Sequence, residues 1–193
     1  MVRKMNESEF KEVLERKIKE KLGNKEYEVK RNANLIYKVL INENLQFEPN
    51  VPNNPKRGRY AFQTDLLLTK KIKDKRLPLV VIETKFGGFS THDILTYSSK
   101  AQKHKEIYPY LRYGLVVGGV NVIQNRFFTH NIGFDFAYAL KEIEDNSLNE
   151  LVEIIKGQIK NAELILDIFR NRNQARSFNT QISIKKLDGE SNE

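Results

Sequence analysis

The stretch Leu77-Pro-Leu-Val-Val-Ile-Glu-Thr-Lys-Phe86 is the most informative part of the sequence. Its β-branched residues predict a strand, and its nearly unbroken apolar run predicts that both faces of this strand are buried. Two charged residues, Glu83 and Lys85, interrupt the run. Because side chains alternate along a strand, these two point to one face and Thr84 points to the other. Apolar neighbours argue against a solvated ion pair, so we interpret Glu83 and Lys85 as a candidate site.

The segment before this strand supplies a second carboxylate. Residues 59–69 predict another strand, and a charged turn over residues 70–76 joins the two as a hairpin. This hairpin can bring Asp65, the first aspartate in the chain, opposite the face of Glu83. Two carboxylates that converge in an apolar sheet repel each other unless a cation lies between them. Hard oxygen ligands suit Mg²⁺, and the backbone carbonyl of Thr84 can add a third.

The Glu-x-Lys spacing gains its meaning from this context, because it occurs four times in the chain. The copies that begin at Glu9 and Glu15 fall on a predicted helix, where residues two apart do not share a face. The copy that begins at Glu28 has no aspartate before it. Glu83 alone begins a copy in an apolar strand that follows an aspartate-bearing strand.

Apolar periodicity and capping signals predict the remaining elements. A helix over residues 6–22 starts at an Asn6–Glu9 capping box and stops at Gly23, and a proline-rich loop covers residues 48–58. The other predicted elements are a helical or extended piece at 33–45, a helix capped by Thr91 to about Ile107, a strand within 112–123, short strands in 126–139, and a helix from Ser147, with a capping box to Glu150, to about Arg170.

The order helix, strand, strand, strand with Glu-x-Lys, helix, strand resembles the PD-(D/E)xK nuclease superfamily. The resemblance rests on Asp65 and on Glu83-Thr84-Lys85. It implies an α/β fold with a mixed (α+β) sheet, a restriction-endonuclease-like core flanked by helices, and an extra C-terminal helix. On this basis residues 1–193 are a single nuclease domain, with a core of about 6–120, a helical appendage of about 146–172 and a loose tail of 174–193.

The resemblance also implies a reaction, the hydrolysis of phosphodiester bonds. Asp65, Glu83 and the Thr84 carbonyl would hold one or two Mg²⁺ ions, and no small-molecule cofactor is expected. Lys85 would orient or activate the attacking water and stabilise charge in the transition state. Many members of the superfamily add a glutamate from the first helix. Glu7 and Glu15 both fit the edge of the buried stripe, and we take Glu15 as the candidate beside the alternative of a solvated side chain.

Three residues of the helix after Lys85 are candidate phosphate contacts. Lys100, Lys103 and His104 lie at i, i+3 and i+4, and in this fold that helix commonly approaches the DNA backbone; a solvated basic face is the alternative. Arg57 and Arg59 are further candidates. Nucleases of the RecB type carry Gln-x-x-x-Tyr on this helix, but here Glu106 follows Gln102 at that spacing.

Three segments resemble the cleavage modules of type IIS restriction endonucleases: Gln63-Thr-Asp65, Glu83-Thr-Lys-Phe-Gly-Gly88 and Tyr108-Pro-Tyr-Leu-Arg-Tyr-Gly114. The likeness is to the small subunit of heterodimeric enzymes, which cuts one strand of double-stranded DNA while a larger subunit recognises the site and cuts the other. A stand-alone homodimeric type II enzyme, a junction-resolving or repair nuclease of the same fold, and a non-catalytic DNA-binding module remain alternatives.

Composition narrows the function classes. The 193 residues include 33 Lys and Arg against 25 Asp and Glu, a net charge of +8 that favours nucleic acid as a partner. The chain has no cysteine, which excludes disulfides and Cys-based metal sites, and its three histidines lack metal-ligand spacing. No apolar run is long enough for a membrane helix and no signal peptide is recognised, so we expect a cytoplasmic protein that does not bind membranes.

Overall fold

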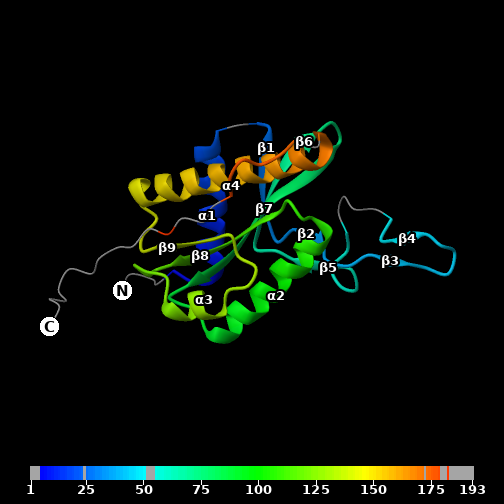
Figure 1. Cartoon of the computed structure of the whole chain (residues 1–193). Coiled ribbons are helices and arrows are strands. Elements are labelled where there is room, and N and C mark those ends of the chain that lie inside the picture. Colours follow the sequence, from blue (N-terminus) through cyan, green and yellow to red (C-terminus); the bar gives the residue numbers. More distant parts are fainter. Residues whose placement is uncertain (1–4, 24, 51–54, 172, 179–181, 183–193) are drawn as a thin grey trace.

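The computed structural model describes residues 5–23, 25–50, 55–171, 173–178 and 182. A five-stranded sheet with the order β1-β6-β7-β8-β9 forms its centre (Figure 1). The strands are β1 (Tyr27–Arg31), β6 (Leu66–Ile72), β7 (Lys75–Phe86), β8 (Arg112–Gly118) and β9 (Phe136–Leu140). The pairs β1–β6 and β6–β7 are antiparallel, whereas β7–β8 and β8–β9 are parallel. The predicted mixed sheet is therefore confirmed.

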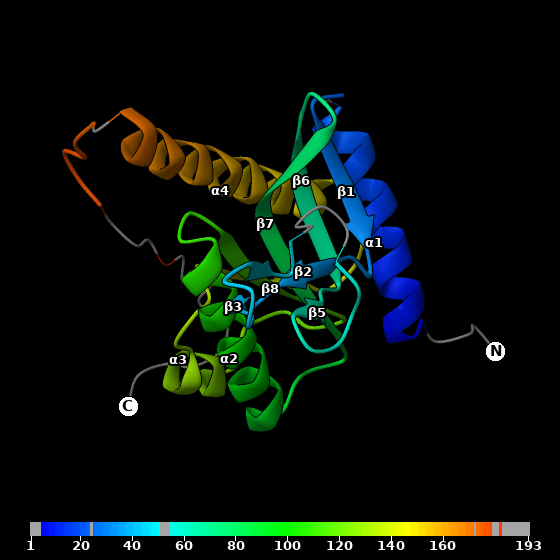
Figure 2. The same cartoon turned by 90° about the vertical axis from the view of Figure 1, so that its right-hand side faces the viewer.

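Helices cover both faces of this sheet (Figure 2). They are α1 (Glu7–Leu22), α2 (Thr91–Ile107), α3 (Asn125–His130) and α4 (Asp145–Asn171). One core cluster joins α1 and α4 to the sheet through residues such as Phe10, Leu14 and Ile155. A second cluster joins α2 and α3 to the other face through Ile94 and Phe127. In the described part of the chain, none of these helices has the length and apolar character that crossing a lipid bilayer requires.

The N-terminal helix forms as its sequence predicts. The Asn6 side chain accepts the N–H of Glu9, and the Glu9 carboxylate accepts the N–H of Asn6. These bonds satisfy two backbone donors that a helix start leaves free. Gly23 ends the helix in the left-handed conformation, at φ 58°. The capping box therefore fixes where α1 begins, and the start of α1 lies beside the candidate site.

The predicted hairpin of the second and third core strands is also present, but its bounds differ. The strand expected over residues 59–69 is two strands, β5 (Ala61–Gln63) and β6, with Thr64 and Asp65 between them. Backbone bonds from Asn32 N–H to the Asp65 carbonyl and from Thr64 N–H to the Ala33 carbonyl continue the antiparallel pairing across this break, and the Thr64 hydroxyl also donates to Ala33. The predicted charged turn is correspondingly shorter, because charged residues of 70–76 extend both strands and the turn lies between Ile72 and Lys75.

An insertion between β1 and β6 adds two small sheets. Strands β2 (Asn34–Ile36) and β5 form one, and β3 (Leu40–Ile41) and β4 (Phe47–Glu48) form the other. Residues 33–45 are thus extended rather than helical. In Figure 1 the β3–β4 hairpin extends away from the main sheet. Its side chains Ile41, Leu45 and Phe47 are exposed.

Several predicted boundaries in the second half are corrected. Ser90 rather than Thr91 caps α2, because its side chain accepts the N–H of Asp93. Residues 125–130 form helix α3 instead of a strand, which lets Phe127 pack into the core. The last helix begins at Asp145, ahead of the predicted Ser147. In the predicted tail, residues 174–178 and 182 are exposed and irregular, and residues 179–181 and 183–193 lie outside the described residues.

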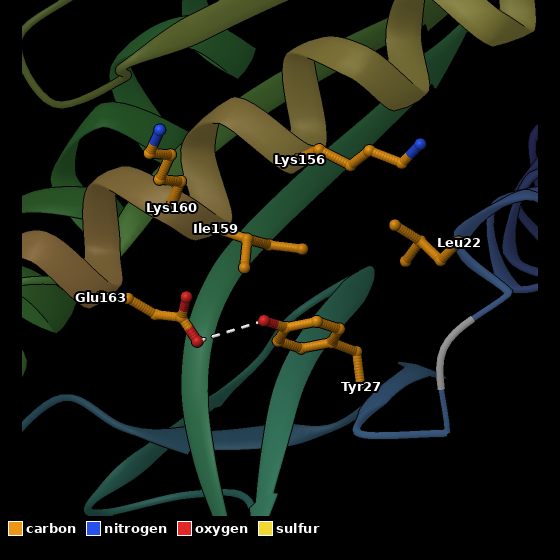
Figure 3. A pocket seen from close by; sticks show the side chains of 6 residues that line it. All are labelled: Leu22, Tyr27, Lys156, Ile159, Lys160 and Glu163. Atoms are coloured by element: carbon orange, nitrogen blue, oxygen red, sulfur yellow. Dashed lines mark hydrogen bonds between the residues drawn. The ribbon is translucent and has the colours of Figure 1, made fainter.

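The C-terminal helix is fastened to the antiparallel edge of the sheet by Glu163. Its carboxylate accepts the Tyr27 hydroxyl at 3.1 Å and the Lys70 ammonium at 2.7 Å. Figure 3 shows the hollow beside this contact, where Tyr27 of β1 faces Glu163 of α4. These bonds join α4 to β1 and β6, so the predicted appendage is part of the packed structure.

Gly118 offers a test of how closely α1 packs on β8. A Cβ atom at this position would lie 2.5 Å from the ring of Phe10. We expect Gly118→Ala to lower the free energy of unfolding by about 1–3 kcal/mol, because the ring must shift within a packed core. The measurement is urea denaturation followed by circular dichroism.

The matched control is Gly157→Ala on α4, where a Cβ meets nothing within 4 Å. In a helix interior this change should raise stability by roughly 0.5–1 kcal/mol. An unchanged denaturation midpoint for Gly118→Ala would contradict the close contact between Phe10 and β8.

Candidate active site

The candidate site lies where β6 and β7 separate. Their pairing ends at Leu66 and Ile82, so β7 continues toward Phe86 without β6 beside it. Asp65 stands at this fork, immediately before β6. Its Oδ2 accepts the Thr84 N–H at 2.8 Å and the Thr84 hydroxyl at 3.1 Å. The carboxylate thus takes the place of a strand partner and is fixed against β7.

Glu83 is a buried carboxylate. Its exposed fraction is 1%, and its Oε1 accepts the Lys100 ammonium of α2 at 2.8 Å and the Tyr113 hydroxyl of β8 at 2.7 Å. Burial raises the pKa of Glu83, the negative charge of Asp65 raises it further, and Lys100 and Tyr113 act in the opposite direction.

Lys85 lies on the same stretch of β7, among acidic neighbours. Its ammonium is 3.1 Å from Asp93 Oδ1 at the start of α2 and 3.6 Å from Glu7 Oε2 at the start of α1. Burial acts to lower the pKa of Lys85, but the bond to Asp93 and the charge of Glu7 outweigh it, and the pKa is raised. Lys85 is therefore a cation at neutral pH. Glu83 and Lys85 both meet side chains of α2, as the predicted alternation requires.

The aromatic ring of Tyr97 lies close to two lysines of the site. The Lys85 ammonium is 5.7 Å from the ring centroid, and the Lys100 ammonium is 5.4 Å from it. Burial and the nearby carboxylates raise the pKa of Tyr97, so its hydroxyl stays protonated. Both cations are therefore attracted by the π-face of the ring.

The helix glutamate expected in the site is Glu7, not Glu15. Glu15 pairs with Arg31 of β1 at 2.6 Å and with Lys19 at 3.5 Å, so that prediction is wrong. The reason is geometric: eight residues of helix separate the two glutamates by about 12 Å along the axis. Glu7 belongs to the first turn, which the Asn6 cap places beside Lys85.

The predicted phosphate contacts have different environments. Lys103 is exposed on α2, and Arg57 and Arg59 are exposed before β5, so all three are accessible to a ligand. Lys100 instead turns inward to Glu83. The phosphate contact predicted for His104 is wrong, because its ring is fully buried. The shared helix face that the spacing predicts is thus divided between solvent, the site and the core.

Sequence reasoning missed four residues of the site: Lys11, Asp93, Tyr97 and Tyr113. Lys11 forms a hydrogen-bonded ion pair with Asp65 Oδ1. Its helical spacing of four from Glu7 was an available signal for a shared face. Tyr113 lies in a strand that reads as uniformly apolar, and nothing in the pattern marks its hydroxyl as a partner of Glu83.

The oxygen atoms of the site are candidate ligands for a hard divalent cation. Among the described residues, no group of three or more histidine, aspartate or glutamate side chains gathers as a metal cluster. The site offers two carboxylates and a carbonyl instead. In an extended strand the N–H and C=O of one residue point to the same side, so the Thr84 carbonyl faces the side of Asp65, as its N–H does. Three hard oxygens with water ligands suit Mg²⁺, which keeps several waters in proteins.

Comparison with known proteins adds little to this geometry. No protein-family model matches the chain, and no curated protein sequence matches it. One similar solved structure is the crystal structure of the pre-specific restriction endonuclease BsaWI in complex with DNA. The sequence identity is 14% and the TM-score is 0.35. The match covers 56% of this chain and 43% of that one, so it spans less than half of that endonuclease chain.

The buried histidine gives a pH test of the α2 packing beside the site. Its Nε2 faces the Leu35 carbonyl at 3.2 Å, and its Nδ1 has no partner in the described structure. Burial lowers the pKa of His104 to about 4 from an ordinary 6.5. Between these values the unfolded chain binds a proton that the folded chain does not. The stability from neutral His104 is therefore complete above pH 6.5 and is lost as the pH falls toward 4.

When the pH is lowered from roughly 7 to 4.5, the free energy of unfolding of the wild type should fall by about 2 kcal/mol more than that of His104→Gln. Urea denaturation at both pH values measures this difference. His92→Gln, an exposed histidine on the same helix, is the control and should follow the wild type. Identical pH dependence in wild type and His104→Gln would show that His104 titrates normally in the fold.

Proposed function

We propose that this chain is a Mg²⁺-dependent endonuclease that hydrolyses phosphodiester bonds of double-stranded DNA. One observation carries the proposal. Asp65 and Glu83 converge at the fork of two strands, and the protonated Lys85 follows two residues later on the same strand. A buried carboxylate such as Glu83 is costly in a sheet unless a cation accompanies it. The same three residues carry the sequence resemblance to the nuclease superfamily.

The carboxylates of Asp65 and Glu83 and the Thr84 carbonyl would hold the metal. When bound, Mg²⁺ supplies charge neutralisation at the phosphate and a water of lowered pKa. Tyr113 holds the Glu83 carboxylate in one orientation, and the Thr84 N–H and hydroxyl hold that of Asp65. These bonds hold the two carboxylates in position before a metal ion binds.

Lys85 would act as a fixed cation. Its raised pKa keeps the proton on Nζ, which makes it poorly suited to accept a proton from water. Glu7 and Asp93 hold the ammonium in position, so it can stabilise negative charge on a phosphate oxygen without reorganisation. We assign transition-state stabilisation and water orientation to Lys85.

Exposed basic residues would hold the DNA. Lys103 on α2 and Arg57 and Arg59 before β5 are exposed. The chain also carries a net charge of +8. Contacts of this kind bind the backbone of any sequence, so they account for affinity and not for a recognition site.

For recognition we propose a larger partner subunit, as in heterodimeric type IIS restriction enzymes. The β3–β4 hairpin supports this assignment, because exposed fractions of 63% at Ile41, 85% at Leu45 and 67% at Phe47 create an apolar surface away from the main sheet. Such surfaces commonly mark contacts with other proteins. In this arrangement the chain would cut one strand and the partner would read the site.

The test is cleavage of plasmid DNA by the purified chain with Mg²⁺. We expect slow nicking by the wild type alone. Lys85→Ala should reduce the rate by roughly a hundredfold or more, because it removes a cation aimed at the developing charge. The matched control is Lys160→Ala, an exposed lysine on α4, which should cut like the wild type.

Full activity of Lys85→Ala would contradict the assigned role. If the chain alone produced discrete linear fragments, the partner-subunit proposal would be wrong, and a self-sufficient homodimeric enzyme would be favoured. Preference for branched over linear DNA would favour a junction-resolving or repair nuclease. DNA binding without cleavage, and without a divalent-ion site that Asp65→Ala removes, would favour a non-catalytic module.

A further inference from the structure

Lys100 occupies an unusual position for a lysine of an outer helix. Its ammonium donates to Glu83 Oε1 at 2.8 Å and to the Gln63 carbonyl at 3.1 Å. Its side chain is 18% exposed, and its partner Glu83 is almost completely buried. The Lys100 ammonium therefore supplies the positive charge that a buried carboxylate requires.

The two carboxylates of the site are both neutralised in this way. Lys11 pairs with Asp65, and Lys100 pairs with Glu83. A divalent cation placed between the carboxylates would meet two positive charges at close range. Repulsion at such distances in a poorly solvated site is strong. At least one lysine must therefore leave its carboxylate for a divalent ion to bind well.

Of the two lysines, Lys100 has a second position available for its side chain. It lines an open groove of about 620 Å³ between α2 and Phe62 of β5, together with Thr96, Tyr97 and Ser99. The Tyr97 ring, 5.4 Å from the ammonium, offers a second favourable place for the cation. A lysine has a flexible stem and can change partners by rotating its side chain.

We infer that Lys100 is an exchanging cation: it occupies the cation position at Glu83 in the metal-free protein and moves to a phosphate of the substrate when a divalent ion binds. This inference rests on the proposed function. The Lys100 side chain then has two tasks in sequence. It protects the buried carboxylate before metal binding, and it binds the DNA strand in the groove afterwards.

The first measurement is isothermal titration with Ca²⁺ at about pH 8 and without DNA, because Ca²⁺ also prefers oxygen ligands. Lys100→Met removes the competing charge and keeps an unbranched side chain only one atom shorter. We expect it to bind Ca²⁺ about tenfold more tightly than the wild type. Lys100→Arg keeps the charge, and Lys160→Met alters an exposed lysine of α4. Neither should show the gain.

The second measurement is binding of a short DNA duplex as a function of salt. With Ca²⁺ present, Lys100→Met should bind DNA more weakly than the wild type, and its salt slope should fall by about one phosphate contact. Without Ca²⁺, the two proteins should have the same slope, because Lys100 is then held by Glu83. Gain of metal affinity and loss of DNA affinity in one variant is the signature of the exchange.

Equal or weaker Ca²⁺ binding by Lys100→Met would overturn the inference, provided that its circular dichroism spectrum shows the wild-type fold at the temperature of the titration. The inference would also be overturned if, in the presence of Ca²⁺, Lys100→Met had the same salt slope for DNA binding as the wild type. Failure of the proposed function has a different appearance. In that case wild type and Asp65→Asn would bind Ca²⁺ equally, and the site would not be a metal site at all.

Discussion

The burial of the Glu83 carboxylate is the constraint on which the rest of the site depends. A carboxylate with 1% exposure in the middle of a sheet needs partners from every side. Tyr113 supplies one from β8, and Lys100 supplies one from α2. The buried carboxylate therefore ties β7 both to β8 and to α2. The local stability of this region and its proposed chemistry have the same physical origin.

The second carboxylate depends on an interruption of the fold. Asp65 lies in the two-residue step between β5, which ends at Gln63, and β6, which begins at Leu66. The insertion between β1 and β6 thus does more than add surface, since the bonds of Thr64 to Ala33 set the position of Asp65. The N-terminal helix completes the arrangement, because its first turn brings Glu7 to Lys85 and its second brings Lys11 to Asp65.

The sequence was sufficient to predict the parts of the structure that local patterns govern. The apolar run of β7, the capping box of α1 and the spacing of Glu83 and Lys85 each depend on neighbours along the chain. Tertiary packing decided the rest. Periodicity could not separate Lys100, which turns to the site, from His104, which turns to the core. The hydroxyl of Tyr113 gained its role from a strand thirty residues away.

The most direct test is a crystal of the protein grown with Mn²⁺, a metal that prefers the same oxygen ligands and scatters anomalously. If the fork is a metal-dependent active site, an anomalous peak should lie within roughly 2.0–2.4 Å of carboxylate oxygens of both Asp65 and Glu83, by analogy with oxygen-bound divalent ions. In the same map, the Lys100 ammonium should no longer contact Glu83. A crystal with Lys100 still bonded to Glu83 and no peak between the two carboxylates would contradict the claim that this fork is a metal-dependent active site.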